Sequence, residues 1–186
     1  MDKRHEMIAG AARVFEQEGF RGIGIDRVLA SVGASTRTLY KHFGSRDGLV
    51  LAVLDARHRA FMAELGQAPK DGNEQGHPVA AFFDTLKAWT DRHGARGCML
   101  LRARAEYGAA NKDIVALSGR QKQEYRIEVA RRVQAVLGRV DARLATQVWL
   151  LLEGAAAGAS VAGVSVIDDA REAALLLLAL AGRRVP

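Results

Sequence analysis

The sequence is poor in cysteine, proline and aromatic residues. Its single cysteine, Cys98, excludes an intramolecular disulfide framework and suits a reducing compartment. Three prolines and an aromatic share of 6% give little sign of β structure, whereas the abundant Ala, Leu, Arg and Glu favour helices. The longest charge-free apolar run near the end, Gly154 to Ile167, has 14 residues and is too short to span a membrane. The N-terminus enters an amphipathic pattern and shows no signal peptide, so we expect a cytoplasmic protein.

Hydrophobic residues and positive charge are plentiful. Hydrophobic residues make up 49% of the 186 positions and charged residues 26%, which is the balance of a globular protein with a real core. A chain of this length favours one small and one larger compact unit. The formal net charge of +6 suits a nucleic-acid partner, although a membrane surface or another acidic partner would also fit.

Hydrophobic periodicity predicts an all-α protein of about nine helices. Apolar residues recur at helical spacing, and glycines such as Gly19 and Gly33 interrupt the pattern. Polar, Gly- and Pro-rich residues 67–78 form the clearest loop. The predicted helices cover residues 4–18, 25–32 and 36–43, a fourth helix that follows the capping residue Ser45 and reaches Leu65, and residues 79–92, 99–107, 112–137, 141–164 and 168–184.

The second and third predicted helices have the arrangement of a helix-turn-helix. They are short and are separated by Gly33, Ala34 and Ser35, and Ser35 is expected to cap the third helix. In such a motif the second helix lies in the DNA major groove. From Ser35 through Arg46 there are three basic residues and no carboxylate, which favours a polyanion, although a solvated helix face has the same composition.

The fourth predicted helix is apolar on two sides, which is typical of a helix packed against both its neighbours in the chain. We therefore expect it to connect two domains. The predicted division is a DNA-binding helix-turn-helix domain at residues 1–48, a connecting helix at 49–66, and a ligand-binding and dimerisation domain at 67–186.

The stretch GFRGIGIDRVLASVGASTRTLYKHFGSRDGLVLAVL resembles the N-terminal domain of the TetR/AcrR family of transcription regulators, with the pattern IxxxLxxxGxxxxTLYxHFxSxxxLV. The resemblance covers roughly Arg4 to Leu54. Gly24 departs from it, because the family usually has Thr or Ser there to cap the second helix and touch phosphate. Arg37 also replaces a small residue. The resemblance and the donor-rich helix together predict a DNA-binding set of Arg4, Arg27, Ser35, Thr36, Arg37, Thr38, Tyr40, Lys41, His42 and Arg46.

These DNA-binding residues have different implied roles. The helix from Thr36 to His42 contacts bases or phosphates, Arg46 clamps phosphate together with the N-terminus of the fourth helix, and Arg4 and Arg27 make peripheral contacts. Leu39 and Phe43 are expected to be core anchors, and packing is the alternative for Tyr40.

The C-terminal half contains no catalytic, metal-binding or phosphate-loop motif, so we expect neither an enzyme nor a cofactor nor a metal. The segments RGCMLLRARAEY and WLLLEGAAAGAS resemble the regulatory domain of a TetR subgroup, which implies a pocket for a mostly apolar small-molecule effector. For each candidate, simple core filling is the alternative. The candidates are Phe82, Leu86, Trp89, Met99, Tyr107, Tyr125 and Trp149 for the wall, with Arg102, Glu106 and Glu153 as polar contacts.

The last two predicted helices have the composition of a dimer interface. Glycines at 154, 158 and 163 allow close helix approach, and the run Leu175 to Leu178 cannot all face one subunit's core. In TetR-like proteins the two final helices pair with their mates, so the resemblance implies a homodimer. A twofold dimer sets its recognition helices about 34 Å apart, or a multiple, and requires a near-palindromic operator.

Together these features predict a sequence-specific DNA-binding transcription regulator, a repressor that a small molecule releases from its operator. The alternatives are a nonspecific DNA-binding protein without an effector, and a ligand-binding protein or enzyme of the same fold. The basic cluster from Arg120 to Arg143 is expected to be solvated surface, with contact to an acidic ligand or a partner as the alternative. Cys98, at a predicted helix start, is either a small buried residue or a redox sensor.

Overall fold

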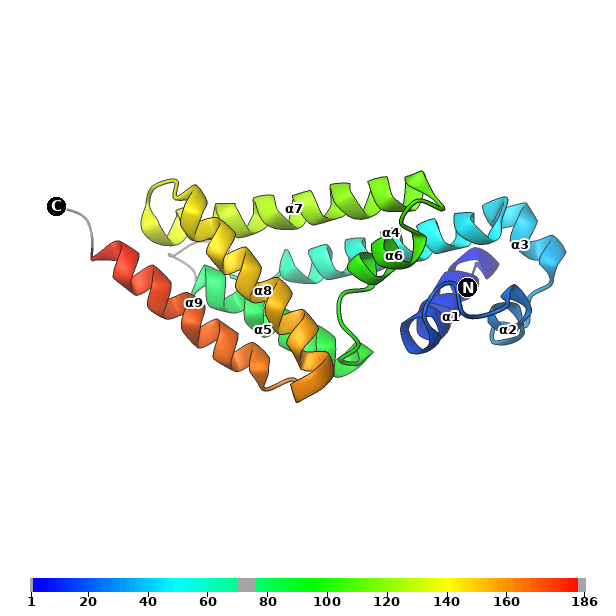
Figure 1. Ribbon diagram of the computed structural model, residues 1–186, viewed down its shortest axis with the longest axis horizontal. Coiled ribbons are helices and arrows are strands. Elements are labelled where there is room, and N and C mark those ends of the chain that lie inside the picture. Colours follow the sequence, from blue (N-terminus) through cyan, green and yellow to red (C-terminus); the bar gives the residue numbers. More distant parts are fainter. Residues whose placement is uncertain (1, 70–75, 184–186) are drawn as a thin grey trace. The chain divides into compact units, whose positions relative to one another are not determined.

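The computed structural model describes residues 2–69 and 76–183 and is all-α within them, as predicted. Figure 1 shows the helices in chain order. Where the described residues allow the comparison, each helix lies within two residues of its predicted bounds, and α3, α6 and α7 agree to the residue. The predicted end of the last helix at residue 184 and residues 70–75 of the predicted loop lie outside the described residues. The helices are α1 (Lys3–Glu18), α2 (Ile25–Ala30), α3 (Thr36–Phe43), α4 (Arg46–Leu65), α5 (Pro78–His93), α6 (Met99–Tyr107), α7 (Lys112–Leu137), α8 (Ala142–Ala162) and α9 (Val166–Gly182).

The helices form two compact units. Unit 1 comprises residues 1–60 and 99–121, and unit 2 comprises residues 61–98 and 122–186. Each predicted domain is continuous in sequence, whereas in the structure α6 and the first part of α7 belong to the same unit as the N-terminal helices. The compact units are therefore interleaved in sequence.

Unit 1 is built around the aromatic and aliphatic residues of its short N-terminal helices. Asp2 caps α1 by accepting the Arg4 amide at 3.2 Å, and Gly19 ends that helix with a φ of 82°. Phe15 and Phe20 are fully buried, with ring centroids 5.2 Å apart. The same core takes Leu39 from α3 and Tyr107 from α6, so the helix-turn-helix and α6 share one hydrophobic cluster.

Helix α4 supplies side chains to both hydrophobic cores. Leu49, Val53 and Leu54 are fully buried in the cluster of unit 1. Phe61 and Leu65 lie in the cluster of unit 2. The helix continues unbroken from one set to the other.

Unit 2 contains a buried arginine that the sequence did not indicate. The Arg132 side chain has no exposed surface. Its guanidinium donates to the carbonyl oxygens of Leu65, Pro69 and Pro78, each at 2.8 Å, and to Glu128 at 2.7 Å. The expectation that Arg120 to Arg143 is solvated surface is therefore wrong for Arg132, because a helix end and its following loop supply enough acceptors to bury a cation.

Helices α8 and α9 lie side by side and are joined at Gly163, which has a φ of 85° (Figure 1). Among the described residues, α8 is the one helix that is long and apolar enough to cross a membrane. The charge-free run that begins at Gly154 is shorter than this helix and is too short for a span by itself. A packed core helix meets the same criterion, and Leu144, Val148 and Leu152 are buried in the core of unit 2.

Candidate functional site

Helix α3 is held by caps at both ends. As predicted, Ser35 is its N-cap: the hydroxyl accepts the Thr38 amide at 3.2 Å and lies 2.9 Å from the Thr38 hydroxyl. Gly44 ends the helix with a φ of 71°, and Leu39 anchors it in the core with 2% exposure. Gly33, in the preceding turn, has a φ of 55°, a left-handed conformation that glycine adopts without strain.

The remaining side chains of α3 form a polar, cationic face. Thr36, Arg37 and Lys41 are exposed, and Tyr40 keeps 60% of its surface accessible. Thr38 and His42 are half-buried at its edge. Neither Arg37 nor Lys41 makes an ion pair with any residue in the described part of the chain, so both charges are available to an external anion.

Arg4 and Arg27, the two predicted peripheral contacts, both have partners inside unit 1. The Arg4 guanidinium lies 5.4 Å from the centroid of the Phe43 ring, at the end of α3. The Arg27 side chain is bonded to the Glu18 carboxylate at 2.7 and 2.9 Å. This hydrogen bond raises the pKa of Arg27 and lowers that of Glu18. A phosphate would therefore compete with Glu18 for Arg27.

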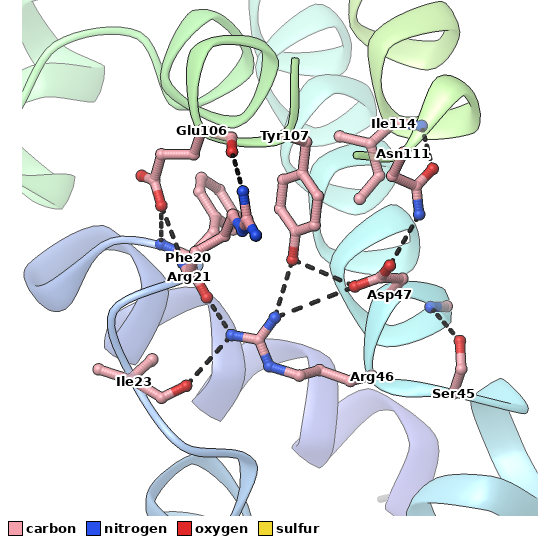
Figure 2. Close-up of polar contacts among 11 residues, drawn as sticks. Phe20, Arg21, Ile23, Ser45, Arg46, Asp47, Glu106, Tyr107, Asn111 and Ile114 are labelled. Carbon is pink, nitrogen blue, oxygen red and sulfur yellow. Dashed lines mark hydrogen bonds and ion pairs between the residues drawn. The ribbon is translucent and has the colours of Figure 1, made fainter. Parts of the chain in front are cut away.

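Arg46, the predicted phosphate clamp, points into the protein instead (Figure 2). Its guanidinium donates to the Phe20 carbonyl, to the Ile23 carbonyl at 3.2 Å and to the Tyr107 hydroxyl at 2.9 Å. These acceptors lie on the segment that joins α1 to α2 and on α6. In this conformation Arg46 fixes the N-terminus of α4 to that segment, and a phosphate contact would require it to leave these partners.

Three residues predicted as ligand contacts also belong to unit 1. The Glu106 carboxylate accepts the backbone amides of Phe20 and Arg21, each at 2.8 Å (Figure 2). Arg102 donates to the Glu16 carbonyl at 3.0 Å, near the end of α1. The Tyr107 hydroxyl donates to Asp47 at 3.2 Å. These contacts attach α6 to the segment after α1 and to the first turn of α4, a role that sequence spacing could not indicate.

The same network continues into α7. Asn111 donates to the second Asp47 oxygen at 2.8 Å, and its own side-chain oxygen accepts the Ile114 amide at 3.1 Å (Figure 2). Burial raises the pKa of Tyr107 above its ordinary value, so its hydroxyl stays protonated and available as a donor. Met99, another predicted ligand contact, is buried in this core as well.

The other predicted ligand contacts cluster in unit 2 as a group of aromatic rings. Tyr125 lies at its centre, with ring centroids 4.8 Å from Phe82 and 5.6 Å from Phe61. Trp89 packs edge-on to Phe61 at 5.4 Å. Leu86 is buried in the same core. Phe61 was absent from the predicted set because its stripe on α4 resembled ordinary core.

Trp149 and Glu153, both on α8, lie next to this aromatic group. Trp149 donates its indole N–H to the Glu153 carboxylate at 3.1 Å, and Lys122 makes an ion pair with the same carboxylate. The Lys122 ammonium lies 4.9 Å from the centroid of the Tyr125 ring. Six of the ten predicted ligand contacts therefore belong to unit 2, namely Phe82, Leu86, Trp89, Tyr125, Trp149 and Glu153. The other four belong to unit 1, namely Met99, Arg102, Glu106 and Tyr107.

An apolar groove runs along the outer face of α8 and α9. It encloses about 510 Å³ and is lined mainly by leucines, among them Leu150, Leu176 and Leu180. These three side chains are 55%, 59% and 58% exposed, respectively. Leu178 is buried, so the run from Leu175 to Leu178 does divide between core and surface, as expected.

Comparison with known proteins identifies the kind of protein that unit 1 resembles. Residues 7–53 match the family model described as bacterial regulatory proteins, tetR family. The chain is 24% identical over 116 residues to the HTH-type transcriptional repressor NemR of Escherichia coli, which is 61% of this chain and 58% of NemR. It is 28% identical over 104 residues to the transcriptional activator FasR of Mycolicibacterium smegmatis, covering 54% and 45%. Each alignment covers less than two thirds of the relative.

A solved structure extends the similarity to nearly the whole chain. A TetR-family transcriptional regulator from Streptomyces coelicolor superimposes with a TM-score of 0.86 and 25% sequence identity. The superposition covers 97% of this chain and 96% of that protein. The predicted all-α fold, with an N-terminal helix-turn-helix and a C-terminal helical part, is thereby confirmed.

Proposed function

The chain belongs to the TetR family of bacterial transcriptional regulators, and on that premise we propose that it binds a near-palindromic operator through α3. This is a family of regulators and not of enzymes. The observation that carries the proposal is the exposed face of α3, where Arg37 and Lys41 have no ion-pair partner among the described residues. Arginine can read guanine bidentately, and lysine can bind phosphate as a point charge.

The dimer needed to read two half-sites forms through α8 and α9 in this proposal. Three half-exposed leucines line one groove on these helices. Contiguous exposed apolar surface of this kind marks an interaction site, and a twofold dimer would bury the same groove on both subunits. Two α3 helices would then face successive major grooves, about 34 Å apart or a multiple of that distance.

The proposed output is repression that an effector relieves. NemR is a repressor and FasR an activator, so the relatives supply both precedents, and the repressor is the simpler action for a protein that blocks its operator. The effector would bind at the aromatic group of unit 2 and favour a dimer conformation with wrongly spaced α3 helices. A full swing in operator occupancy requires about 5.5 kcal/mol of preference for that conformation.

Two elements can carry this change through the chain. Helix α4 has buried residues in both hydrophobic clusters. Helix α6 follows Cys98 of unit 2 directly, and it holds the α1–α2 segment through Glu106 and the start of α4 through Tyr107. Any displacement of α6 within unit 1 would disturb the contacts of Arg46 at the start of α4. The protein would act in the cytoplasm, where its operator is.

Selection of binding sites from a pool of random DNA duplexes tests the proposal. A dimeric reader enriches two half-sites related by a twofold axis, with centres about one helical turn or a multiple apart. Enrichment of no motif would support the nonspecific DNA-binding protein instead. A ligand that the protein chemically converts would favour the enzyme alternative.

A further inference from the structure

One oxygen of the Glu153 carboxylate stands out in unit 2. Oε1 accepts the Trp149 indole N–H and faces the Lys122 ammonium. Oε2 is buried and has no hydrogen-bond partner among the described residues. A buried polar atom without a partner is costly, and such atoms are rare in native proteins. Oε2 therefore marks a place where a donor from outside the chain would be stabilised.

The charge at this place is already balanced. The Glu153 and Lys122 side chains are 12% and 14% exposed, so the pair is largely removed from water. An added cation would be repelled by Lys122, and an added anion by Glu153. A neutral N–H or O–H donor meets neither cost, because it bonds to Oε2 and leaves the ion pair intact.

The surroundings of Glu153 favour an aromatic skeleton for that donor. Tyr125, Trp89 and Trp149 are partly buried aromatic residues packed against the core of unit 2. Phe61 stacks on Tyr125, and Phe82 packs edge-on against it. Flat rings gain from stacked or edge-on contact with such side chains in addition to the area they bury.

We propose that the aromatic group of unit 2 binds an uncharged, flat aromatic compound whose N–H or O–H group donates to Glu153 Oε2. This inference rests on the proposed effector site and names the chemical class that the site takes. It assigns Glu153 the role of selecting for the donor, while the aromatic side chains supply affinity for the ring.

The test compares two probes that differ only in the donor. Binding of 2-naphthol and of 2-methoxynaphthalene to the full chain, without DNA, is measured by isothermal titration calorimetry. A hydrogen bond to a buried charged group predicts a preference for 2-naphthol of about 10- to 100-fold. Equal affinity for the two probes would overturn the proposal. Tighter binding of 2-naphthoate would also overturn it and would make the selecting group Lys122 or Arg126, whose guanidinium lies 5.0 Å from the centroid of the Trp149 ring.

A variant without the ion pair provides the control. Replacing Lys122 and Glu153 together, as Lys122→Met with Glu153→Leu, avoids leaving one buried charge alone and so preserves the fold. This double variant is expected to bind both naphthalenes with similar affinity. A preference for 2-naphthol that survives in the variant would contradict the role of Glu153. Since no DNA is present, failure here leaves the operator proposal untouched, and loss of operator recognition would not affect this result.

Discussion

Arg37 and Lys41 occupy opposite ends of the same short helix. Arg37 lies in the first turn of α3, and Lys41 in its last. In a helix-turn-helix the N-terminal residues of the recognition helix reach base edges, whereas residues farther along also meet the phosphate backbone. The two exposed cations are therefore expected to play different parts in DNA recognition.

Separate substitutions of Arg37 and Lys41 distinguish their roles in DNA binding. Arg37→Ala should relax base preference at one position of each half-site and cost about 1–3 kcal/mol on the preferred sequence. Lys41→Ala should weaken all sequences evenly and lower the slope of affinity against salt by about one. Binding to single-base operator variants at several salt concentrations measures both. Arg120→Ala, at an exposed position on α7, removes the same charge as a control. An even loss for Arg37→Ala would assign that side chain to phosphate.

Arg132 and Arg131 make a matched pair for stability. Both donate to Glu128, but Arg132 is fully buried and Arg131 is 42% exposed. Arg132→Met leaves three carbonyl oxygens and a carboxylate short of a donor, so we expect a loss of about 3–5 kcal/mol in the free energy of unfolding. Arg131→Met should cost less than about 1 kcal/mol. Urea denaturation measures both, and similar small losses would contradict the structural role of Arg132.

Tyr125 makes stability depend on alkaline pH. Burial, with a further contribution from the negative Glu153, raises the pKa of Tyr125 well above its ordinary value of 10.0. Below pH 10 the hydroxyl is neutral in both the folded and the unfolded chain. Above it only the unfolded chain ionises, so the free energy of unfolding should fall by up to about 1.4 kcal/mol per pH unit. Tyr125→Phe should lack this part of the decline. If the free energy of unfolding of the unchanged protein and of Tyr125→Phe declined in parallel with pH, this contribution of Tyr125 would be contradicted.

At the scale of helices, periodicity and caps predicted nearly all of the secondary structure. Ser35, Gly44 and Ser45 are local signals, because a cap or a positive φ acts within one turn, and the bounds of α3 and α4 follow from them. The hydrogen-bond partners of Arg46 lie 23 to 61 residues away, and Leu65 lies 67 residues from Arg132. Helical spacing identifies a polar or apolar face but not the distant element it meets, so these contacts could not be predicted.

Helix α2 lacks the side-chain cap that its neighbours have. Gly24 occupies its N-cap position with a φ of −68°, no side chain caps the helix there, and a Cβ atom would meet nothing within 4 Å. Gly24→Ser should therefore stabilise unit 1 by a few tenths of a kcal/mol. The free energy of unfolding of the serine variant should be higher than that of Gly24→Ala by about 0.5–2 kcal/mol. Thermal and urea denaturation of the two variants measure this. If the added hydroxyl also reaches phosphate, only the serine variant binds DNA more tightly.

For the whole molecule, the exposed leucines of α8 and α9 determine the predicted assembly. Leu176→Glu places a charge in the apolar groove and should convert a dimer to monomers, since burying an unpaired carboxylate is costly. Sedimentation velocity measures the change, and affinity for a two-half-site operator should fall to that for one half-site. Leu101→Glu, at a 43% exposed position on α6, is the matched control and should remain dimeric. A Leu176→Glu protein that remains dimeric would place the interface elsewhere.

The most direct measurement is a titration of the protein with the DNA upstream of its own gene and with a scrambled duplex, each at two salt concentrations. A sequence-reading dimer should bind the upstream fragment more tightly at both concentrations and protect two palindromic half-sites, because base contacts persist when counterions compete for phosphate. Equal, steeply salt-dependent binding to upstream, scrambled and selected duplexes alike would mean that only charge is read, and would contradict the proposed operator-specific regulator.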